Sequence, residues 1–357
     1  MQDIVDQFAG IIRAAAEDKA PLCIRGGGSK DFYGNHIPGR NDGVLDTSAY
    51  AGIVDYERTE LVLTARAGTR LADLETELRK HGQMMAFEPP HFEPAATLGG
   101  CIATGLSGPR RASAGAVRDF VLGVRMLDGR GDDLRFGGQV MKNVAGYDVS
   151  RLMTGSMGTL GLLLEISLKV LPLPAMETTL RIPMVEAEAI ERMNLWAGKP
   201  LPVSATCFCD GELFIRLSGA EPAVRAAHAK LGGDEIDDGE VFWESVREQS
   251  HSFFQSGKSL WRLSIKSTAP PLPLPGKQLM EWGGALRWWA DETGVDAGVA
   301  RGIAKAAGGH ATLFRSHESC ADVFHPLEPA MLAIHRRIKE KFDPMGILNP
   351  GRMYPQY

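Results

Sequence analysis

The spacing of apolar residues predicts a helix and then a strand at the start of the chain. In MQDIVDQFAGIIRAAAEDKA the apolar residues recur at helical spacing and the acidic residues fall on the opposite face, which is typical of an amphipathic helix. The side chains expected on its apolar face are Ile4, Val5, Phe8, Ile11 and Ile12. PLCIR, over residues 21–25, then predicts a short strand that leads directly into three glycines.

Two hairpins and a helix are predicted before residue 173. GIVDYERTELVLTARAG and VRDFVLGVRMLDGRGDDLRFGG each predict a pair of strands, joined at residues 58–60 and 128–131. TRLADLETELRKHG, between the hairpins, predicts a helix with leucines on one face. A helix around 149–153 and a long strand that ends at Val170 follow, and Pro172 and Pro174 mark a boundary.

The second half of the chain has a different pattern of predicted helices and strands. A helix over 186–197, strands over 203–208 and 212–218 and a helix over 222–231 are typical of helices packed on an antiparallel sheet. SLWRLSIKST, GALRWWAD and GGHATLF predict further strands, and the prolines in APPLPLPG predict a surface loop. The last helix is predicted over 327–341, before the turn cluster FDPMGILNPGRMY.

Composition narrows the class of protein. The 357 residues are enough for about two domains, and 44% apolar with 23% charged residues is ordinary for a globular chain. The 39 basic and 44 acidic residues give a net charge of −5 without a basic tract, so nucleic acid is not expected as a partner. No signal peptide or membrane span is recognisable. We therefore expect a cytoplasmic protein, with membrane association only peripheral if any.

Five scattered cysteines without a C-x-x-C pair are typical of reduced thiols, and an iron-sulfur cluster within this chain is not expected. Cys207 and Cys209 would share one face of a strand, where packing is the favoured interpretation.

Three glycine-rich loops, over 25–30, 97–108 and 155–161, need a common explanation. The first fails the G-x-G-x-x-G pattern because Asp31 stands where the third glycine is required, and no Walker frame precedes Lys30. Each loop alone is typical of an ordinary turn. Three such loops could supply the backbone N–H groups that bind an extended, phosphate-bearing cofactor. Basic residues near them in the sequence are Arg25, Lys30, Arg110 and Arg111.

Four motifs carry a resemblance to a known family. IRGGGSKDFYG, EPAATLGGCIATGLSG, MKNVAGYDVSRLMTGSMGTLGLLLEISLKVLP and DPMGILNPGRM resemble, in order, the motifs of the PCMH-type (vanillyl-alcohol-oxidase-type) FAD-binding family. The resemblance implies an α+β fold. Residues 1–173 would form a PCMH-type FAD-binding domain of two α/β subdomains. Residues 174–326 would form an antiparallel-sheet α+β (ferredoxin-like) cap domain, and 327–357 a helix and turn that return to the FAD domain.

The same resemblance implies which residues contact FAD. Around the pyrophosphate it places Arg25, Gly26, Gly27, Gly28, Ser29 and Lys30. Along the diphosphate and the flavin it places Thr97, Gly99, Gly100, Thr104, Gly105, Ser107 and Gly108. Near the flavin ring or the ribityl chain it places Gly158, Thr159, Gly161 and Leu162. From the C-terminal element it adds Asn349 and Arg352, whereas Asp148 is expected to cap a helix.

Departures from the family concern the chemistry. Met157 replaces a common glutamate, and Cys101 stands where asparagine is common; a covalent flavin bond is conceivable there, but a small buried thiol is favoured. Related hydroxy-acid dehydrogenases resemble one another in a histidine-rich metal site, whose spacing this chain lacks, so we expect no metal and name no catalytic residue. The scattered candidates are His310, His317, Glu318, Asp322, His325 and His335.

Within the family the chain is most similar to the second flavin-domain subunit of bacterial glycolate oxidases. This resemblance implies FAD as cofactor, a catalytic flavin subunit and an iron-sulfur subunit as partners, and a small 2-hydroxy acid as the substrate of the complex. Our leading hypothesis is an FAD-dependent oxidoreductase subunit that takes part in oxidation of glycolate to glyoxylate by electron transfer. Two alternatives stay open: a non-redox scaffold with a vestigial flavin site, and a stand-alone FAD-dependent alcohol oxidase.

Overall fold

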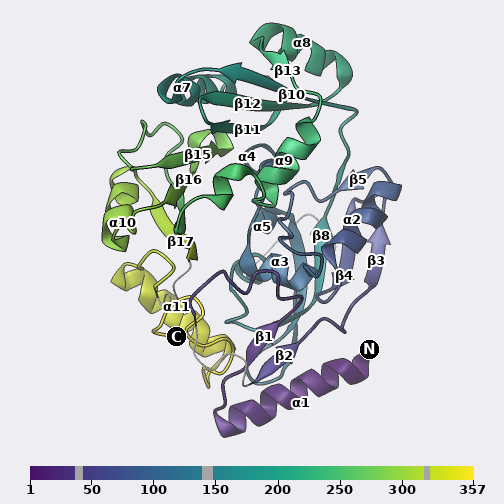
Figure 1. Ribbon diagram of the computed structural model, residues 1–357. Coiled ribbons are helices and arrows are strands. Elements are labelled where there is room, and N and C mark those ends of the chain that lie inside the picture. The colour runs from purple at the N-terminus through teal and green to yellow at the C-terminus, as the bar shows by residue number, and fades with distance from the viewer. Residues whose placement is uncertain (37–42, 139–147, 317–321) are drawn as a thin grey trace.

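The computed structural model describes residues 1–36, 43–138, 148–316 and 322–357. Two larger sheets organise these residues, one of five strands and one of eight, and both are antiparallel. Figure 1 shows the eight-stranded sheet above the five-stranded sheet, with the last helix, α11 (Pro329–Phe342), returning beside the first part of the chain. This mixture of helices and antiparallel sheet is the α+β fold class predicted from the sequence.

The five-stranded sheet has the order β3-β4-β8-β6-β7. Its strands are β3 (Ile53–Glu57), β4 (Val62–Arg66), β6 (Val121–Leu127), β7 (Asp133–Gly137) and β8 (Leu162–Lys169). Both predicted hairpins, β3–β4 and β6–β7, are present. The central strand β8 is buried on both faces of the sheet. Because successive side chains of a strand point to opposite sides, Leu163 lies in one core and Leu162 and Leu164 lie in another.

Helices cover both faces of this sheet. On one face lie α2 (Leu71–Lys80) and α3 (Leu98–Thr104), whose buried leucines complete a core with β4, β6 and β8. On the other lies α1 (Gln2–Asp18), which buries Val5, Phe8 and Ile12 as predicted but leaves Ile11 exposed. Beside α1, β1 (Cys23–Arg25) and β2 (Val44–Asp46) form a parallel pair.

Short elements complete this part of the molecule. They are α4 (Arg111–Ala114), α5 (Val117–Phe120), α6 (Val149–Leu152), β5 (Gln83–Met84) and β9 (Leu171–Pro172). The Asp148 side chain accepts a hydrogen bond of 3.1 Å from the backbone N–H of Arg151 and so caps α6, as predicted.

The eight-stranded sheet has the order β13-β10-β12-β11-β15-β16-β14-β17. Its strands are β10 (Met176–Pro183), β11 (Val203–Cys209), β12 (Glu212–Gly219), β13 (Asp234–Glu235), β14 (Ser259–Ser264), β15 (Lys277–Glu281), β16 (Leu286–Asp291) and β17 (His310–Ser316). The helices of this region are α7 (Glu186–Ala197), α8 (Glu221–Leu231), α9 (Gly239–Arg247), α10 (Ala297–Ala306) and the 3₁₀ turns η1 (Ser252–Gln255) and η2 (Trp282–Gly284). Residues of α7 and α8 share a core with the β10–β12 strands.

The elements of this region that were not predicted include β15 and α9. Strand β15 has only two apolar residues, Leu279 and Met280, and follows the proline-rich loop, whereas α9 lies in an acidic stretch. The prolines of that loop are exposed as predicted, and Leu272 and Leu274 between them are buried.

Candidate functional site

The three glycine-rich segments lie together around α3, which the second of them contains. Residues 25–30 follow β1 and line a hollow of about 70 Å³ with Thr97, Gly100 and Thr104, and with two residues from the end of the chain. An adjoining hollow of about 60 Å³ shares Gly100 and reaches the third loop. We call these two hollows the cradle. The sequence-predicted cofactor residues that line it are Arg25, Gly26, Gly27, Gly28, Ser29, Lys30, Thr97, Gly99, Gly100, Thr104, Gly158, Gly161, Asn349 and Arg352.

Five predicted residues lie outside both hollows: Gly105, Ser107, Gly108, Thr159 and Leu162. Gly105 ends α3 in the left-handed conformation, with φ of 66°, and the Ser107 hydroxyl accepts a hydrogen bond from the N–H of Val117. Thr159 instead lines a separate pocket of about 610 Å³ on the other side of the third loop, and Leu162 is buried in a core.

The glycines of the first loop are required by the chain itself. A Cβ on Gly27 would lie less than 3.0 Å from the carbonyl oxygen of Ala95, and one on Gly26 would overlap the Thr97 hydroxyl. Gly28 has a φ of +75°, which side chains other than glycine rarely adopt. Close packing against Ala95 and Thr97, together with the positive φ of Gly28, therefore accounts for these glycines without a ligand.

Gly100 is different, because it is a glycine that faces open space. A Cβ built there meets only the Thr97 hydroxyl, at 3.3 Å, and Gly100 lines both hollows. A side chain at this position would enter the cradle.

The cradle is suited to an anion. Within the described ranges, the backbone N–H groups of residues 26–29 donate to no acceptor of the chain, as in a backbone nest. The Lys30 side chain adds a positive charge and is only 8% exposed. Its ammonium donates hydrogen bonds of 3.3 Å to the Ser29 hydroxyl and to the carbonyl of His91, and lies 5.5 Å from the centre of the Phe92 ring.

Burial dominates the electrostatics of Lys30 and of the neighbouring Cys101. It lowers the pKa of the Lys30 ammonium, and this effect exceeds the opposing electrostatic effects of Cys101, Glu248 and Glu93. It raises the pKa of the Cys101 thiol to about 12, and this side chain packs in the core under α3. The neutral buried thiol favoured by the sequence is consistent with this position.

The third loop is fixed by backbone hydrogen bonds and by Asn349. The N–H groups of Gly155 and Met157 donate to the carbonyls of Ile102 and Ala103 in α3, at 2.9 and 2.8 Å. The Asn349 side chain accepts from the N–H of Ile24 at 2.8 Å and donates to the carbonyl of Met157 at 2.6 Å. Asn349 thus joins the strand before the first loop to the third loop.

Arg352 binds backbone carbonyls. Its guanidinium donates to the carbonyls of Asn35, Asp31 and Tyr33 and is 3% exposed. It therefore fastens the C-terminal turn to the segment that follows the first loop, at the edge of the cradle.

Sequence reasoning missed several residues that line the cradle. They are Ile24, Asp31, Thr47, Ala67, Ala103, Met157 and Leu163. Most are small or apolar residues next to predicted glycines or in neighbouring strands, so only their position beside the motifs could have indicated them. Met157 adopts a positive φ of 55° and buries its side chain.

An aromatic layer separates the cradle loops from the eight-stranded sheet. Tyr33, Leu106 and Met157 pack in one core with Trp288 and Phe314, and the ring centres of Tyr33 and Phe314 lie 5.1 Å apart. The Trp282 indole N–H donates to the carbonyl of Gly108 at 3.1 Å, so a residue of η2 binds the end of the second loop.

The two arginines grouped with the loops in the sequence serve the contact with this sheet. The Arg111 guanidinium lies 4.4 Å from the centre of the Trp282 ring. Arg110 pairs with Glu88 at 3.2 Å and with Glu177 at 2.7 Å, and Arg216 of β12 approaches Glu88 to 2.7 Å. Arg110 and Arg111 lie near the glycine-rich loops in the sequence, but their side chains bind residues outside the cradle.

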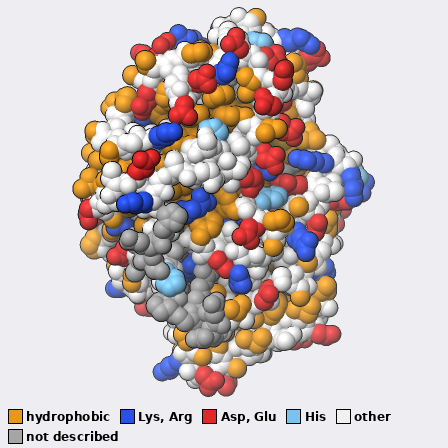
Figure 2. Space-filling model, viewed as in Figure 1, with side chains coloured by type: hydrophobic (Ala, Val, Ile, Leu, Met, Phe, Trp, Pro, Cys, Tyr) orange, Lys and Arg blue, Asp and Glu red, His pale blue; other side chains and the backbone are white. Residues whose placement is uncertain are grey.

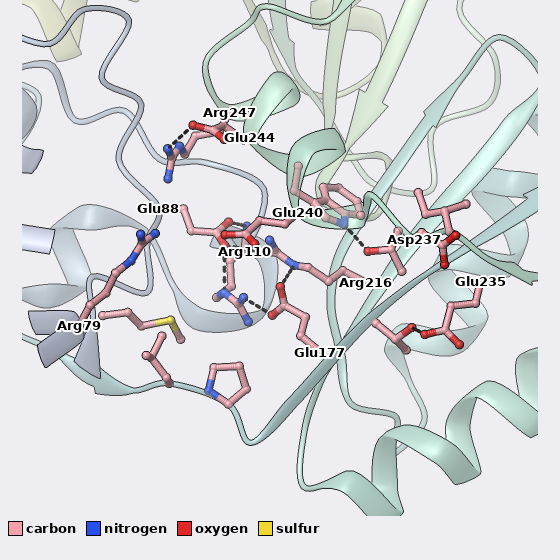
Figure 3. Close-up of a pocket in the computed structure, with 18 residues that line it drawn as sticks. Arg79, Glu88, Arg110, Glu177, Arg216, Glu235, Asp237, Glu240, Glu244 and Arg247 are labelled. Atoms are coloured by element: carbon pink, nitrogen blue, oxygen red, sulfur yellow. Dashed lines mark hydrogen bonds and ion pairs between the residues drawn. The ribbon is translucent and has the colours of Figure 1, made fainter. Parts of the chain in front are cut away.

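The residues of these ion pairs line a charged pocket of about 670 Å³ (Figure 3). Figure 3 shows Arg79 and Arg247 on one side of the pocket and Glu235 and Asp237 on the other. Burial acts to raise the pKa of the Glu88 carboxyl, but the two arginines outweigh it and hold this pKa below its usual range. Figure 2 shows acidic and basic side chains interspersed over the visible face of the molecule.

The candidate histidines that the structure describes do not form a metal site. The ring centres of His310 and His325 lie 6.3 Å apart, and His335 shares a hydrogen bond of 2.8 Å with the Tyr357 hydroxyl; burial lowers the pKa of all three. His317 and Glu318 lie outside the described residues. Among the residues that the structure describes, no group of three or more His, Cys, Asp or Glu side chains could hold a metal ion.

Comparisons with known proteins identify the class. Residues 4–137 match the family described as FAD binding domain. The fold resembles the solved structure of an alkyldihydroxyacetonephosphate synthase, with a TM-score of 0.66 at 16% identity over 96% of this chain and 73% of that one. The first part of the chain, residues 4–137, therefore contains an FAD-binding domain.

One relative defines the family more closely. The chain is 48% identical over 345 residues to glycolate oxidase subunit GlcE of Escherichia coli (strain K12), which covers 97% of this chain and 96% of that protein. It is also 29% identical over 201 residues to glycolate oxidase subunit GlcD of Bacillus subtilis (strain 168), over 56% of this chain and 42% of that protein. The chain belongs to the family of the glycolate oxidase subunit GlcE. Across the described ranges, none of the helices combines the length and apolarity that crossing a bilayer requires.

Proposed function

We propose that this chain is the FAD-binding subunit of a complex that oxidises glycolate or a similar 2-hydroxy acid, together with a catalytic flavin subunit and an iron-sulfur subunit. The observation that carries the proposal is the cradle: one hollow is lined by residues 26–29, whose backbone N–H groups have no acceptor within the described ranges, and by the buried Lys30. The match of this chain to 96% of the length of a GlcE protein supports the subunit role.

The donor set fits the diphosphate of FAD. Residues 26–29 would donate backbone hydrogen bonds to phosphate oxygens, and Lys30 would balance their charge. Asn349 and Arg352 would hold the loops in place through their carbonyl contacts. When bound, FAD supplies the capacity to accept and pass on electrons. The aromatic layer would shield its surroundings from water.

The colour of the purified chain tests the proposal. A yellow protein that releases FAD on heating, is not bleached by glycolate alone and is bleached once both partner subunits are added is the expected result. Bleaching of the isolated chain by glycolate would instead support a stand-alone oxidase.

A non-redox scaffold is a second candidate, and the size of the cradle favours it. Hollows of about 70 and 60 Å³ fit phosphate groups, whereas pockets for whole ligands usually measure about 300–1,000 Å³. A colourless chain that restores activity to the other two subunits would establish this function in place of the first.

A further inference from the structure

Helix α11 is held to the rest of the chain in an unusual way. Of its residues 329–342, Lys339 is the one that is buried, with a side chain 5% exposed, although helices generally dock through an apolar face. Ile338 and Phe342 are only partly buried against the neighbouring core. A buried ammonium is costly unless its charge and its three donors are satisfied.

Lys339 satisfies all three donors at the back of the cradle. Its ammonium donates to the carboxylate of Asp343 at 2.6 Å, to the carbonyl of Thr159 in the third glycine-rich loop at 2.8 Å, and to the carbonyl of Leu348 at 2.8 Å. The Asp343 carboxylate in turn accepts from the N–H groups of Ile347 and Leu348 at 3.1 and 2.8 Å. One ion pair therefore joins a helix, a loop and the C-terminal turn.

This ion pair leads directly to the residues that line the cradle. Leu348 precedes Asn349, whose side chain binds Ile24 and Met157 on either side of the hollow. The position of Asn349 depends on the turn that Asp343 and Lys339 fix.

We infer that Lys339 and Asp343 are positioning residues for the cofactor: they set the third loop and Asn349 in the geometry that binds FAD, without touching it. The inference rests on the proposed function, because it concerns the same cradle. A purely structural pair would lower the stability of the chain but leave the affinity of the folded protein for FAD unchanged.

FAD titration into cofactor-free protein tests the inference, with Lys339→Met compared against Lys341→Met, an exposed lysine on the same helix. We expect the dissociation constant of K339M to rise about tenfold or more, since charge-assisted hydrogen bonds are lost, and that of K341M to stay at the wild-type value. Combining K339M with Asn349→Ser is expected to weaken binding by less than the product of the two single effects, because both act through one geometry.

Amide hydrogen exchange gives a readout that needs no cofactor. Peptides covering residues 155–161 are expected to exchange faster in K339M than in K341M, because the Thr159 carbonyl loses its donor. If K339M does not fold, Asp343→Asn, which keeps the ammonium and its two carbonyl acceptors, takes its place in both experiments.

The outcomes separate the two proposals. Wild-type FAD affinity and wild-type exchange in K339M would overturn the positioning role alone. Failure of the wild-type chain to bind FAD would overturn the proposed function and this inference with it.

Discussion

Replacing Lys30 with methionine removes the positive charge of the cradle while keeping much of the apolar stem. In the free protein Lys30 is 8% exposed, its ammonium donates two hydrogen bonds of 3.3 Å, and burial lowers its pKa. Because a buried charge without a close counter-charge opposes folding, we expect K30M to leave the cofactor-free protein as stable as wild type or more stable, by up to about 1 kcal/mol in the free energy of unfolding.

Binding should respond in the opposite direction. A hydrogen bond to a charged group is worth about 1.5–3 kcal/mol, and about 1.4 kcal/mol corresponds to a factor of ten in affinity. K30M should therefore raise the dissociation constant for FAD about 10- to 100-fold. Quenching of FAD fluorescence on titration into cofactor-free protein measures this constant, and thermal unfolding without FAD measures the stability.

The pH dependence follows from the lowered pKa of Lys30. In the free protein its charged form opposes folding at low pH, so this contribution to stability improves as pH rises from the lowered pKa toward the ordinary value of 10.5. Affinity for FAD requires the ammonium and should fall over the same alkaline range in the wild type but not in K30M. A K30M protein that is less stable without FAD yet binds it with wild-type affinity would refute the assignment of Lys30 to the phosphate site.

Three further predictions concern other parts of the molecule. Gly100→Asp should fold and lose FAD affinity by about tenfold or more, since its carboxylate enters the cradle, whereas Gly10→Asp at an exposed position of α1 should bind normally in the same titration. Gly27→Asp should instead fail to fold or melt at a much lower temperature, because it meets the Ala95 carbonyl, and circular dichroism would reveal a native-like melt that contradicts this. Glu88→Gln should lower the free energy of unfolding by about 3 kcal/mol, since it leaves Arg110 and Arg216 undercompensated. Because the folded-state pKa of Glu88 is lowered, this difference should be full above pH 4.5 and shrink as pH falls through the lowered pKa, as urea unfolding at several pH values can check.

The local sequence pattern was sufficient to predict those helices and hairpins whose structure depends mainly on their own residues. The helix expected over 186–197 begins and ends as α7 does, and both early hairpins turn where the sequence predicted. The loops of the cradle were also recognisable, because glycine-rich motifs are local.

Contacts between distant segments account for what could not be predicted. A side chain at position 27 is excluded by Ala95, 68 positions further along. The buried Lys339 ammonium donates hydrogen bonds to Thr159 and Asp343. On a helical pattern Lys339 reads as an exposed charge, and Arg110 reads as a phosphate ligand until Glu88 and Glu177 are placed beside it. Strand β15 likewise exists because its neighbours β11 and β16 pair with it, despite its weak alternation.

The packing of Gly27 against Ala95 has a consequence for how this family diverges. The three glycines are required by the close contacts of Gly26 and Gly27 and by the positive φ of Gly28, so a descendant that had stopped using flavin would keep them. Lys30 differs, because burying its charge is expected to cost stability and the proposed anion would offset that cost. In a lineage that has lost the cofactor, we therefore expect Lys30 to be substituted before any of the three glycines.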